Sequence, residues 1–355
     1  MVAYFASRVT VFIAMWLATR SVPGSSFYGL AGAWDGSWYH RLASEGYPHQ
    51  ISFATGDPAQ STLGFFPLFP MSARLVTAAL PGIGPLEAAV LINLLGGLVA
   101  TVLVWRLADG LWDRSVADRS AVLFAFFPGS FIFSLAYSEG LALALAAGCL
   151  LAVHRQRWLL GGALAALATA ARPNMLALVP AVAVAALLAV RNHRRWFALV
   201  APALAPLGFV AFQVFLRLHT GRWDAYVRTQ AEGWGQHVSL LATPDLFRKF
   251  LRNPFLNTNE GIYVAGVILG LIGFGLLVRA RPPAHVLVFT ASILILSLSS
   301  EGLSLSPRVL LTAFPLVYGL AYRLRPASLG IAVGSEAAIL GTLTFLTLTT
   351  LQATP

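Results

Sequence analysis

The sequence is poor in charged side chains and in thiols. Only 11% of its 355 residues are charged, and Cys149 is the single cysteine. Soluble domains carry roughly a quarter of their residues as charged ones, so this composition argues against an ordinary soluble domain. One cysteine excludes a disulfide framework within the chain and a cysteine-based metal site.

Several motifs that hold cofactors are also lacking. The sequence contains no Asp-x-Asp pair, no Walker loop, no Gly-x-Gly-x-x-Gly and no His-Glu-x-x-His. Its seven histidines are isolated from one another, so no local metal motif forms. We therefore expect neither a metal nor another cofactor.

The net charge of +10 does not indicate a nucleic-acid partner. The arginines are scattered through short segments and do not form one continuous basic face. Positive charge beside apolar runs more often reports the orientation of membrane spans.

Long apolar runs dominate what is present, with 57% hydrophobic residues. Runs near 20 residues match the thickness of a bilayer, and helices satisfy their own backbone hydrogen bonds in lipid. The pattern predicts an all-α polytopic membrane protein, one domain over 1–355, with about eleven spans. Their predicted bounds are 2–20, 86–106, 120–135, 137–153, 158–171, 175–190, 196–216, 262–279, 284–300, 308–323 and 328–350.

The first of these runs resembles the hydrophobic region of a signal peptide. Arg8 precedes the apolar stretch 9–18, but Arg20 and Pro23 follow in place of a small-x-small cleavage pattern. We interpret this segment as a retained first span.

Basic residues predict the orientation. Five clusters separate the apolar runs, and placing all of them in the cytoplasm gives a consistent alternation. The N-terminus is then cytoplasmic, and two long loops, 21–85 and 217–261, emerge on the outer face with most of the carboxylates. The clusters are Arg106/Arg114/Arg119, Arg155/Arg157, Arg191/Arg194/Arg195, Arg279/Arg281 and Arg323/Arg325.

The first outer loop offers a candidate base. In a helix over 34–45, Trp34, Trp38 and Leu42 share one face, which predicts an amphipathic helix lying flat at the membrane interface. Asp35 would project beside Tyr39, and a carboxylate among aromatic rings suits proton abstraction. A helix N-cap is the structural alternative for Asp35.

Two arginines lie at predicted outer breaks between helices. Arg172 precedes Pro173 and Asn174, and Arg308 follows Pro307. An arginine at a membrane boundary needs an anionic partner. Arg172 could pair with a lipid phosphate or with Glu139, and two such guanidinium groups facing one cavity would form a phosphate site.

The second outer loop combines aromatic rings with amides. Gln230, Trp234 and His237 supply the stacking surfaces and directional hydrogen bonds that bind sugars, and an interfacial aromatic belt explains the same composition. Trp34, Tyr39 and His40 of the first loop are further candidates for contacts with an acceptor.

The ordered set of motifs resembles the PIG-V family of membrane mannosyltransferases, within the multispanning GT-C glycosyltransferases. It resembles more distantly the bacterial polyprenyl-phosphate-mannose-dependent transferases. The resemblance runs over most of the chain and rests on residues 34–39 with Gly46-Tyr47, 65–70, Pro128, 137–139, 172–174, Gln230 with Trp234-Gly235, and 306–308 with Phe314-Pro315.

That resemblance implies a polyprenyl-phosphate sugar donor, usually mannose, a glycolipid acceptor, and transfer with inversion on the outer face of the plasma membrane. It implies Asp35 as the general base and Arg172 and Arg308 as ligands of the donor phosphate. Asn174, Glu139 and Tyr137 would be their polar partners.

Two other readings fit the same helices. A lipid-linked sugar flippase or another transporter would place ionisable residues within its spans and show repeated halves. Here Arg8 and Glu336 are the main charges in spans. The third alternative is a non-catalytic subunit of a glycosyltransferase complex. All three are proteins surrounded by membrane lipids.

Overall fold

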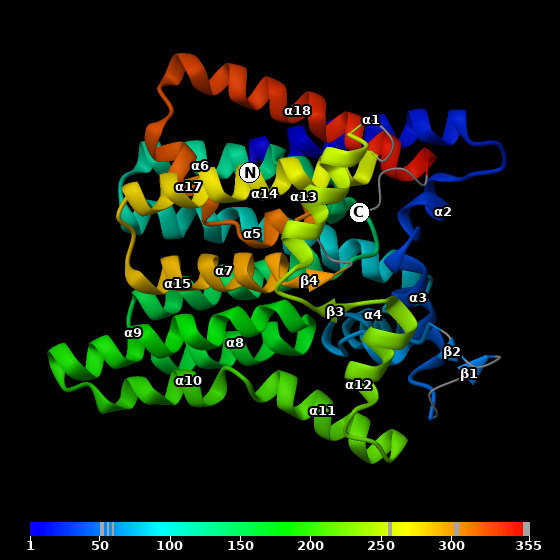
Figure 1. Cartoon of the computed structure of the whole chain (residues 1–355), viewed down its shortest axis with the longest axis horizontal. Coiled ribbons are helices and arrows are strands. Elements are labelled where there is room, and N and C mark those ends of the chain that lie inside the picture. The colour runs from blue at the N-terminus through cyan, green and yellow to red at the C-terminus, as the bar shows by residue number, and fades with distance from the viewer. Residues whose placement is uncertain (50–52, 55–56, 59, 255–257, 302–304, 351–355) are drawn as a thin grey trace.

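The computed structural model describes residues 1–49, 53–54, 57–58, 60–254, 258–301 and 305–350. Over these residues the regular structure is overwhelmingly helical (Figure 1). The structure thus confirms an all-α membrane fold.

Six helical segments among the described residues are long and apolar enough to cross a membrane. Two of them are compound, because short 3₁₀ turns continue directly into α-helix. The six are α1 (Val2–Ser21), α5 (Pro85–Leu111), η3 (Pro173–Ala177) with α9 (Leu178–His193), η4 (Trp196–Leu199) with α10 (Val200–Leu204) and α11 (Leu207–Thr220), α14 (Thr258–Arg279), and α18 (Pro326–Thr349).

Proline interrupts two further predicted spans. Pro128 follows the helix that begins at Arg114, and the 3₁₀ turn after it is bent from that helix by 69°. This helix and this turn, counted together, would be a seventh span. Pro315 likewise separates two short helices. These pairs are α6 (Arg114–Phe126) with η2 (Pro128–Ser134), and α16 (Pro307–Thr312) with α17 (Leu316–Arg323).

Three apolar helices are shorter than the usual crossing length. They are α7 (Glu139–His154), α8 (Trp158–Ala171) and α15 (Ala284–Leu298). Most predicted bounds agree with the structure to within four residues, although the end of 86–106 and the start of 120–135 differ by five and six. The predicted number of about eleven spans is not confirmed. Helix length alone supports six, or seven, over the described residues.

The two long loops and the connection from α15 to α16 contain short elements, including two antiparallel two-residue ladders, β1–β2 and β3–β4. These ladders were not predicted, since runs of two residues carry no periodic signal. The loop elements are α2 (Phe27–Ala31), α3 (Asp35–Glu45), β1 (Phe53–Ala54), β2 (Asp57–Pro58), η1 (Thr62–Gly64), α4 (Leu68–Ala79), α12 (Ala225–Arg228), η5 (Thr229–Gly233), β3 (His237–Val238), α13 (Ala242–Arg252) and β4 (Ser300–Glu301).

The long helices run side by side, and the two ends of the bundle differ. In Figure 1 the elements α2, α3, α4, β1, β2 and α12 gather at the right-hand end. The connections from α9 to η4, from α14 to α15 and from α17 to α18 lie at the left-hand end and contain basic clusters. The two long loops and the basic connections are therefore segregated, as the charge pattern predicts.

Glycine allows α5 and α7 to approach each other closely. A Cβ at Gly96 would lie 2.5 Å from the carbonyl carbon of Gly140, and one at Gly140 would overlap the backbone oxygen of Asn93. This contact holds the start of α7, and with it Glu139, against the middle of the bundle.

A buried arginine ties the first helix to η2. Arg8, 3% exposed, donates to the Ser130 backbone oxygen at 2.6 Å and to Ser134 Oγ at 3.1 Å. Carbonyl and hydroxyl oxygens, in place of a carboxylate, thus satisfy the charge that the sequence places within a span.

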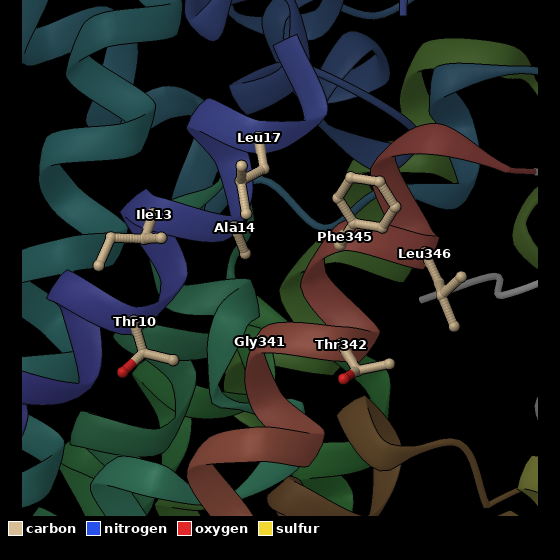
Figure 2. A pocket seen from close by; sticks show the side chains of 8 residues that line it. All are labelled: Thr10, Ile13, Ala14, Leu17, Gly341, Thr342, Phe345 and Leu346. Atoms are coloured by element: carbon tan, nitrogen blue, oxygen red, sulfur yellow. The ribbon is translucent and has the colours of Figure 1, made fainter. Parts of the chain in front are cut away.

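The helices α1 and α18 pack together although they are at opposite ends of the sequence. Figure 2 shows the residues that line the groove between them, among them Ile13 and Leu17 from α1 and Phe345 and Leu346 from α18. The groove has a volume of about 400 Å³ and no charged side chain lines it.

Candidate active site

Asp35 lies in the first turn of α3 at the loop end of the bundle. Its backbone N–H donates to the Tyr137 hydroxyl at 3.1 Å. Trp34, the residue before it, has a positive φ of 56° and donates from its indole to the Thr347 backbone oxygen at 3.1 Å. Trp34, and not Asp35, occupies the N-cap position, so the N-cap alternative for Asp35 is wrong.

A buried amide fixes the segment 137–139, which contacts Asp35 through Tyr137. Asn93 in α5 is fully buried, and its Nδ2 donates to the backbone oxygens of Ile132 and Leu135 at 2.7 and 2.9 Å. Its Oδ1 accepts from the Gly140 N–H at 2.6 Å. These three bonds fix the path of the chain on both sides of Tyr137, Ser138 and Glu139.

Glu139 brings two arginines together. Its side chain is fully buried, and the same carboxylate oxygen, Oε1, lies 2.7 Å from Arg172 Nη1 and 2.6 Å from Arg308 Nε. Arg172 follows α8 in an extended conformation imposed by Pro173. The structure pairs Arg172 with Glu139, one of the two partners that the sequence allowed.

Arg308 also contacts Asp35. Its Nη1 lies 2.8 Å from Asp35 Oδ2, and its guanidinium carbon is 5.0 Å from the centre of the Tyr137 ring. Arg308 lies in the short helix α16. The N-cap of this helix is Ser306, whose hydroxyl accepts a hydrogen bond from the Val309 N–H. Gly129 of η2 lies close against Pro307. A Cβ added to Gly129 would come within 2.9 Å of the backbone nitrogen of Arg308.

These contacts form one charged chain, which we call the acid–arginine network: Asp35, Arg308, Glu139 and Arg172. Its two carboxylates balance its two guanidinium groups. Exposure of the side chains falls from 26% for Asp35 to 12% for Arg172, 9% for Arg308 and 0% for Glu139. Asp35 is thus the member most open to a substrate.

A small cavity of about 100 Å³ borders this network. One wall is polar and one is aromatic, and both long loops contribute to it. The lining residues are Asp35, Tyr39, Gly64, Phe65, Phe66, Ala171, Arg172, Pro173, Gln230, Trp234, Gln236 and Arg308.

The aromatic wall is a cluster of rings from both loops. Trp38 stacks on Phe65 at 6.3 Å between ring centres and meets Trp234 edge-on at 5.2 Å. Gln230 donates to the Gly64 backbone oxygen at 3.2 Å. Trp38 therefore packs against protein, which differs from the predicted membrane-facing tryptophan stripe, and the buried face of α3 consists of Gly36, Tyr39, Leu42 and Ala43.

Some polar atoms around the cavity have no partner within the described residues. Arg172 Nε, Asn174 Oδ1 and the indole nitrogen of Trp234 are each buried without a hydrogen bond. Buried polar groups are normally hydrogen-bonded. Two of these groups, on Arg172 and Trp234, line the cavity itself and indicate a site that a polar ligand would complete.

Burial keeps the nearby phenols neutral. It raises the pKa of Tyr39 to about 12, an effect that the Arg172 charge partly opposes. Burial also raises the pKa of Tyr226 to about 12. Tyr39 and Ser138 share a hydrogen bond at 2.8 Å, and the neutral phenol can act as its donor.

The structure brings together most of the candidates, but not all. Asp35, Tyr39, Arg172, Arg308, Gln230 and Trp234 line the cavity, whereas His40 and His237 do not. His237 is exposed on β3, opposite Glu301. The role of His237 as an acceptor contact stays a prediction, and the residue before it, Gln236, does line the cavity.

Three other candidates support the site from behind the cavity. Trp34 anchors α3 to α18, and the fully buried Tyr137 accepts from Asp35 and lies under Arg308. Asn174 Nδ2 lies 3.4 Å from Thr312 Oγ1 and so links η3 to α16. These residues position the network.

Sequence reasoning did not predict the contacts that Asn93, Ser138 and Gly129 make in the site, although Ser138 belongs to the motif 137–139 and Gly129 follows Pro128. An isolated asparagine in a 27-residue apolar helix was a usable signal, because a buried amide needs partners. Neither Ser138 nor Gly129 carries such a signal. Their roles depend on neighbours far away in the sequence.

Among the described residues, no group of three or more His, Cys, Asp or Glu side chains forms a metal-binding cluster. The charged groups near the cavity are the two acids and two arginines of the network. Chemically, this arrangement offers an exposed carboxylate beside two guanidinium groups that can bind oxyanions.

Comparisons with known proteins agree with this geometry. A family model described as Glycosyltransferase family 87 matches residues 68–307. GPI mannosyltransferase 2 of Drosophila pseudoobscura pseudoobscura is 30% identical over 115 residues, which are 30% of this chain and 23% of that protein.

Solved structures show the same fold. ArnT from Cupriavidus metallidurans bound to undecaprenyl phosphate matches with a TM-score of 0.55 and 14% identity, over 94% of this chain and 63% of that one. Its apo state matches with a TM-score of 0.55 and 14% identity, over 92% and 61%. The chain thus spans less than two thirds of these proteins, and the expected GT-C-like membrane fold is confirmed.

Proposed function

This chain belongs to glycosyltransferase family 87, and we propose that it transfers a hexose, mannose by resemblance, from a polyprenyl phosphate to a hydroxyl group of a glycolipid. The observation that carries the proposal is the acid–arginine network beside a cavity at one end of a membrane bundle. The mannosyltransferase relative and the lipid bound to ArnT support the choice of substrates.

The two arginines are the proposed ligands of the donor phosphate. Both touch the same oxygen of Glu139, so their guanidinium groups are held close together in spite of their like charge. Arg172 Nε has no hydrogen-bond partner among the residues that the structure describes, and guanidinium groups bind phosphate oxygens in bidentate fashion. Glu139 is a positioning residue in this scheme, since it is fully buried and cannot reach the substrate.

Donor binding would also release the base. In the present structure Arg308 holds Asp35 at 2.8 Å, which occupies the carboxylate. A phosphate that binds Arg308 competes with Asp35 for the same cation. Asp35 then becomes free to accept a proton, so we expect that the donor binds first.

The proposed chemical step needs only these groups. Asp35 accepts the proton of the acceptor hydroxyl as that oxygen forms a bond to the anomeric carbon. The bond from this carbon to the phosphate oxygen breaks, and the electron pair leaves with the phosphate. The arginines stabilise its growing charge. Attack opposite to the leaving phosphate inverts the anomeric centre.

The aromatic wall is the proposed sugar-binding surface. Trp234 has a buried indole N–H without a partner, and Gln230 and Gln236 line the cavity beside it. A sugar would complete these hydrogen bonds and stack on a ring. Phe65 lies in the same wall and would exclude water.

We place this site on the outer face of the plasma membrane, with the N-terminus in the cytoplasm. The support is the segregation of the basic connections at the opposite end of the helices (Figure 1), because arginine-rich loops favour the cytoplasmic side.

The experiment uses the purified full chain in vesicles with labelled polyprenyl-phosphate mannose and a glycolipid acceptor. Asp35→Asn should lower the rate of transfer by ~10²–10⁴-fold, the usual contribution of a general base. The control is Glu45→Gln, which removes an exposed acid from the same helix and should leave the rate unchanged. Near-normal transfer by Asp35→Asn would refute the role of the base. Movement of the lipid between leaflets without sugar transfer would instead identify a flippase.

A further inference from the structure

A second groove runs along the surface of α5, α7 and α8. Its volume is about 600 Å³ and its lining is mostly apolar. Its lining includes the small residues Gly96, Ala144 and Gly148, and Leu95 and Leu160, which are about half exposed. A surface of this kind in a membrane takes an acyl chain.

Three arginines lie at one end of this groove. Arg106 is in the last turns of α5, Arg155 directly follows α7, and Arg157 directly precedes α8. All three are exposed. None of them has an ion pair or a side-chain hydrogen bond to any residue that the structure describes.

From this arrangement we propose that the groove is a binding site for an anionic phospholipid. One acyl chain lies along α5, α7 and α8, and the phosphate group lies among Arg106, Arg155 and Arg157. Guanidinium groups match phosphate oxygens in geometry and charge. Basic pockets between membrane helices are known to favour anionic headgroups.

This site is separate from the acid–arginine network. Glu139 begins α7 and Arg155 follows its end, and 16 residues of helix span roughly 24 Å. Arg157 and Arg172 similarly flank the two ends of α8. The bound lipid would brace the end of the helix pair that lies opposite the cavity, and it is not the sugar donor.

The groove between α1 and α18 (Figure 2) is the internal comparison. It is also apolar and accessible from the membrane, but its lining contains no arginine. It should therefore accept acyl chains without preference for the headgroup.

The test measures lipids retained by the full chain in nanodiscs of phosphatidylglycerol or phosphatidylcholine, by native mass spectrometry and thermal unfolding. We expect the native chain to retain phosphatidylglycerol selectively and to be stabilised by it. The triple variant Arg106→Gln, Arg155→Gln and Arg157→Gln should lose this preference by on the order of 10- to 100-fold, since each arginine near a membrane surface contributes appreciably to the attraction.

The matched control removes the same charge elsewhere. Arg191→Gln, Arg194→Gln and Arg195→Gln affect another exposed cluster at the same end of the bundle, and none of these residues lines the groove. This variant should keep the preference. Equal losses in both triple variants would overturn the proposal, because they would reflect net charge alone. Equal retention of both lipids by the native chain would overturn it as well.

A second pair of variants tests the acyl-chain part. Ala144→Leu fills the proposed groove and should reduce lipid retention, whereas Gly341→Leu fills the comparison groove and should not change the preference for phosphatidylglycerol. An excess of inorganic phosphate should fail to displace the lipid; displacement would show that the arginines bind phosphate without the groove. Transfer activity is not needed as a readout, so failure here leaves the proposed reaction untouched.

Discussion

At the scale of single residues, the site is an arrangement of charges that compensate one another. Glu139 is fully buried, and two arginines contact the same oxygen of its carboxylate. Replacing one member of a buried ion pair lowers the free energy of unfolding far more than replacing one member of an exposed pair. The reason is that the remaining buried charge loses a partner and has no water to replace it.

Arg308→Gln should therefore destabilise the protein by on the order of 3 kcal/mol, measured by thermal unfolding in detergent. Adding Glu139→Gln should recover part of this stability, because it again balances the charges of the network, with one carboxylate and one guanidinium group, while transfer activity stays low. The control is Arg41→Gln, whose partner Glu45 is exposed, and which should change stability by less than about 1 kcal/mol. Equal stability of Arg308→Gln and Arg41→Gln would contradict the buried network.

At the scale of elements, the site depends on how closely short helices meet. Arg308 reaches Asp35 because α16 lies directly on η2, and Gly129 permits this approach. The atoms that lie against Gly129 belong to the backbone of Pro307 and Arg308, and backbone cannot move away as a flexible side chain would.

We predict that Gly129→Ala pushes α16 away from η2 and shifts Arg308. A displacement near 1 Å can lower catalysis by about 10²-fold, which a transfer assay with the full chain would measure. Gly334→Ala in α18 is the control, since an added Cβ there meets no atom within 4 Å. It should keep full activity, and a Gly129→Ala enzyme with native kinetics would show that the close contact is not required.

At the scale of the whole molecule, the bundle has two chemically different ends. The loops and the cavity occupy one end, and basic connections occupy the other (Figure 1). This polarity gives a direct test of orientation, because the single native cysteine, Cys149, is buried and single cysteines can be introduced on a silent background.

Glu45→Cys and Arg194→Cys, each combined with Cys149→Ala, would mark the two ends. We expect a membrane-impermeant thiol reagent to label Glu45→Cys in intact cells and Arg194→Cys only after permeabilisation, because both native residues are exposed on opposite ends of the bundle. Labelling of both from the same side would contradict the proposed orientation.

The sequence by itself determined where most of the apolar helices lie along the chain, but not how many of them are long enough to cross a membrane. The predicted spans 2–20, 158–171 and 262–279 differ little from α1, α8 and α14, because apolar length and proline positions are local properties of the chain. It also indicated Asp35, Arg172 and Arg308, since charged residues at the ends of apolar runs are conspicuous.

Only the tertiary structure decided which of these charges meet. Arg308 pairs with Asp35 across nearly the whole sequence, and Asn93 fixes the segment around Tyr137 from another helix. His237, which composition alone could not separate from Gln230 and Trp234, lies outside the cavity. The physical reason is that such contacts depend on how helices pack in space, and residue type and spacing along the chain do not specify that packing.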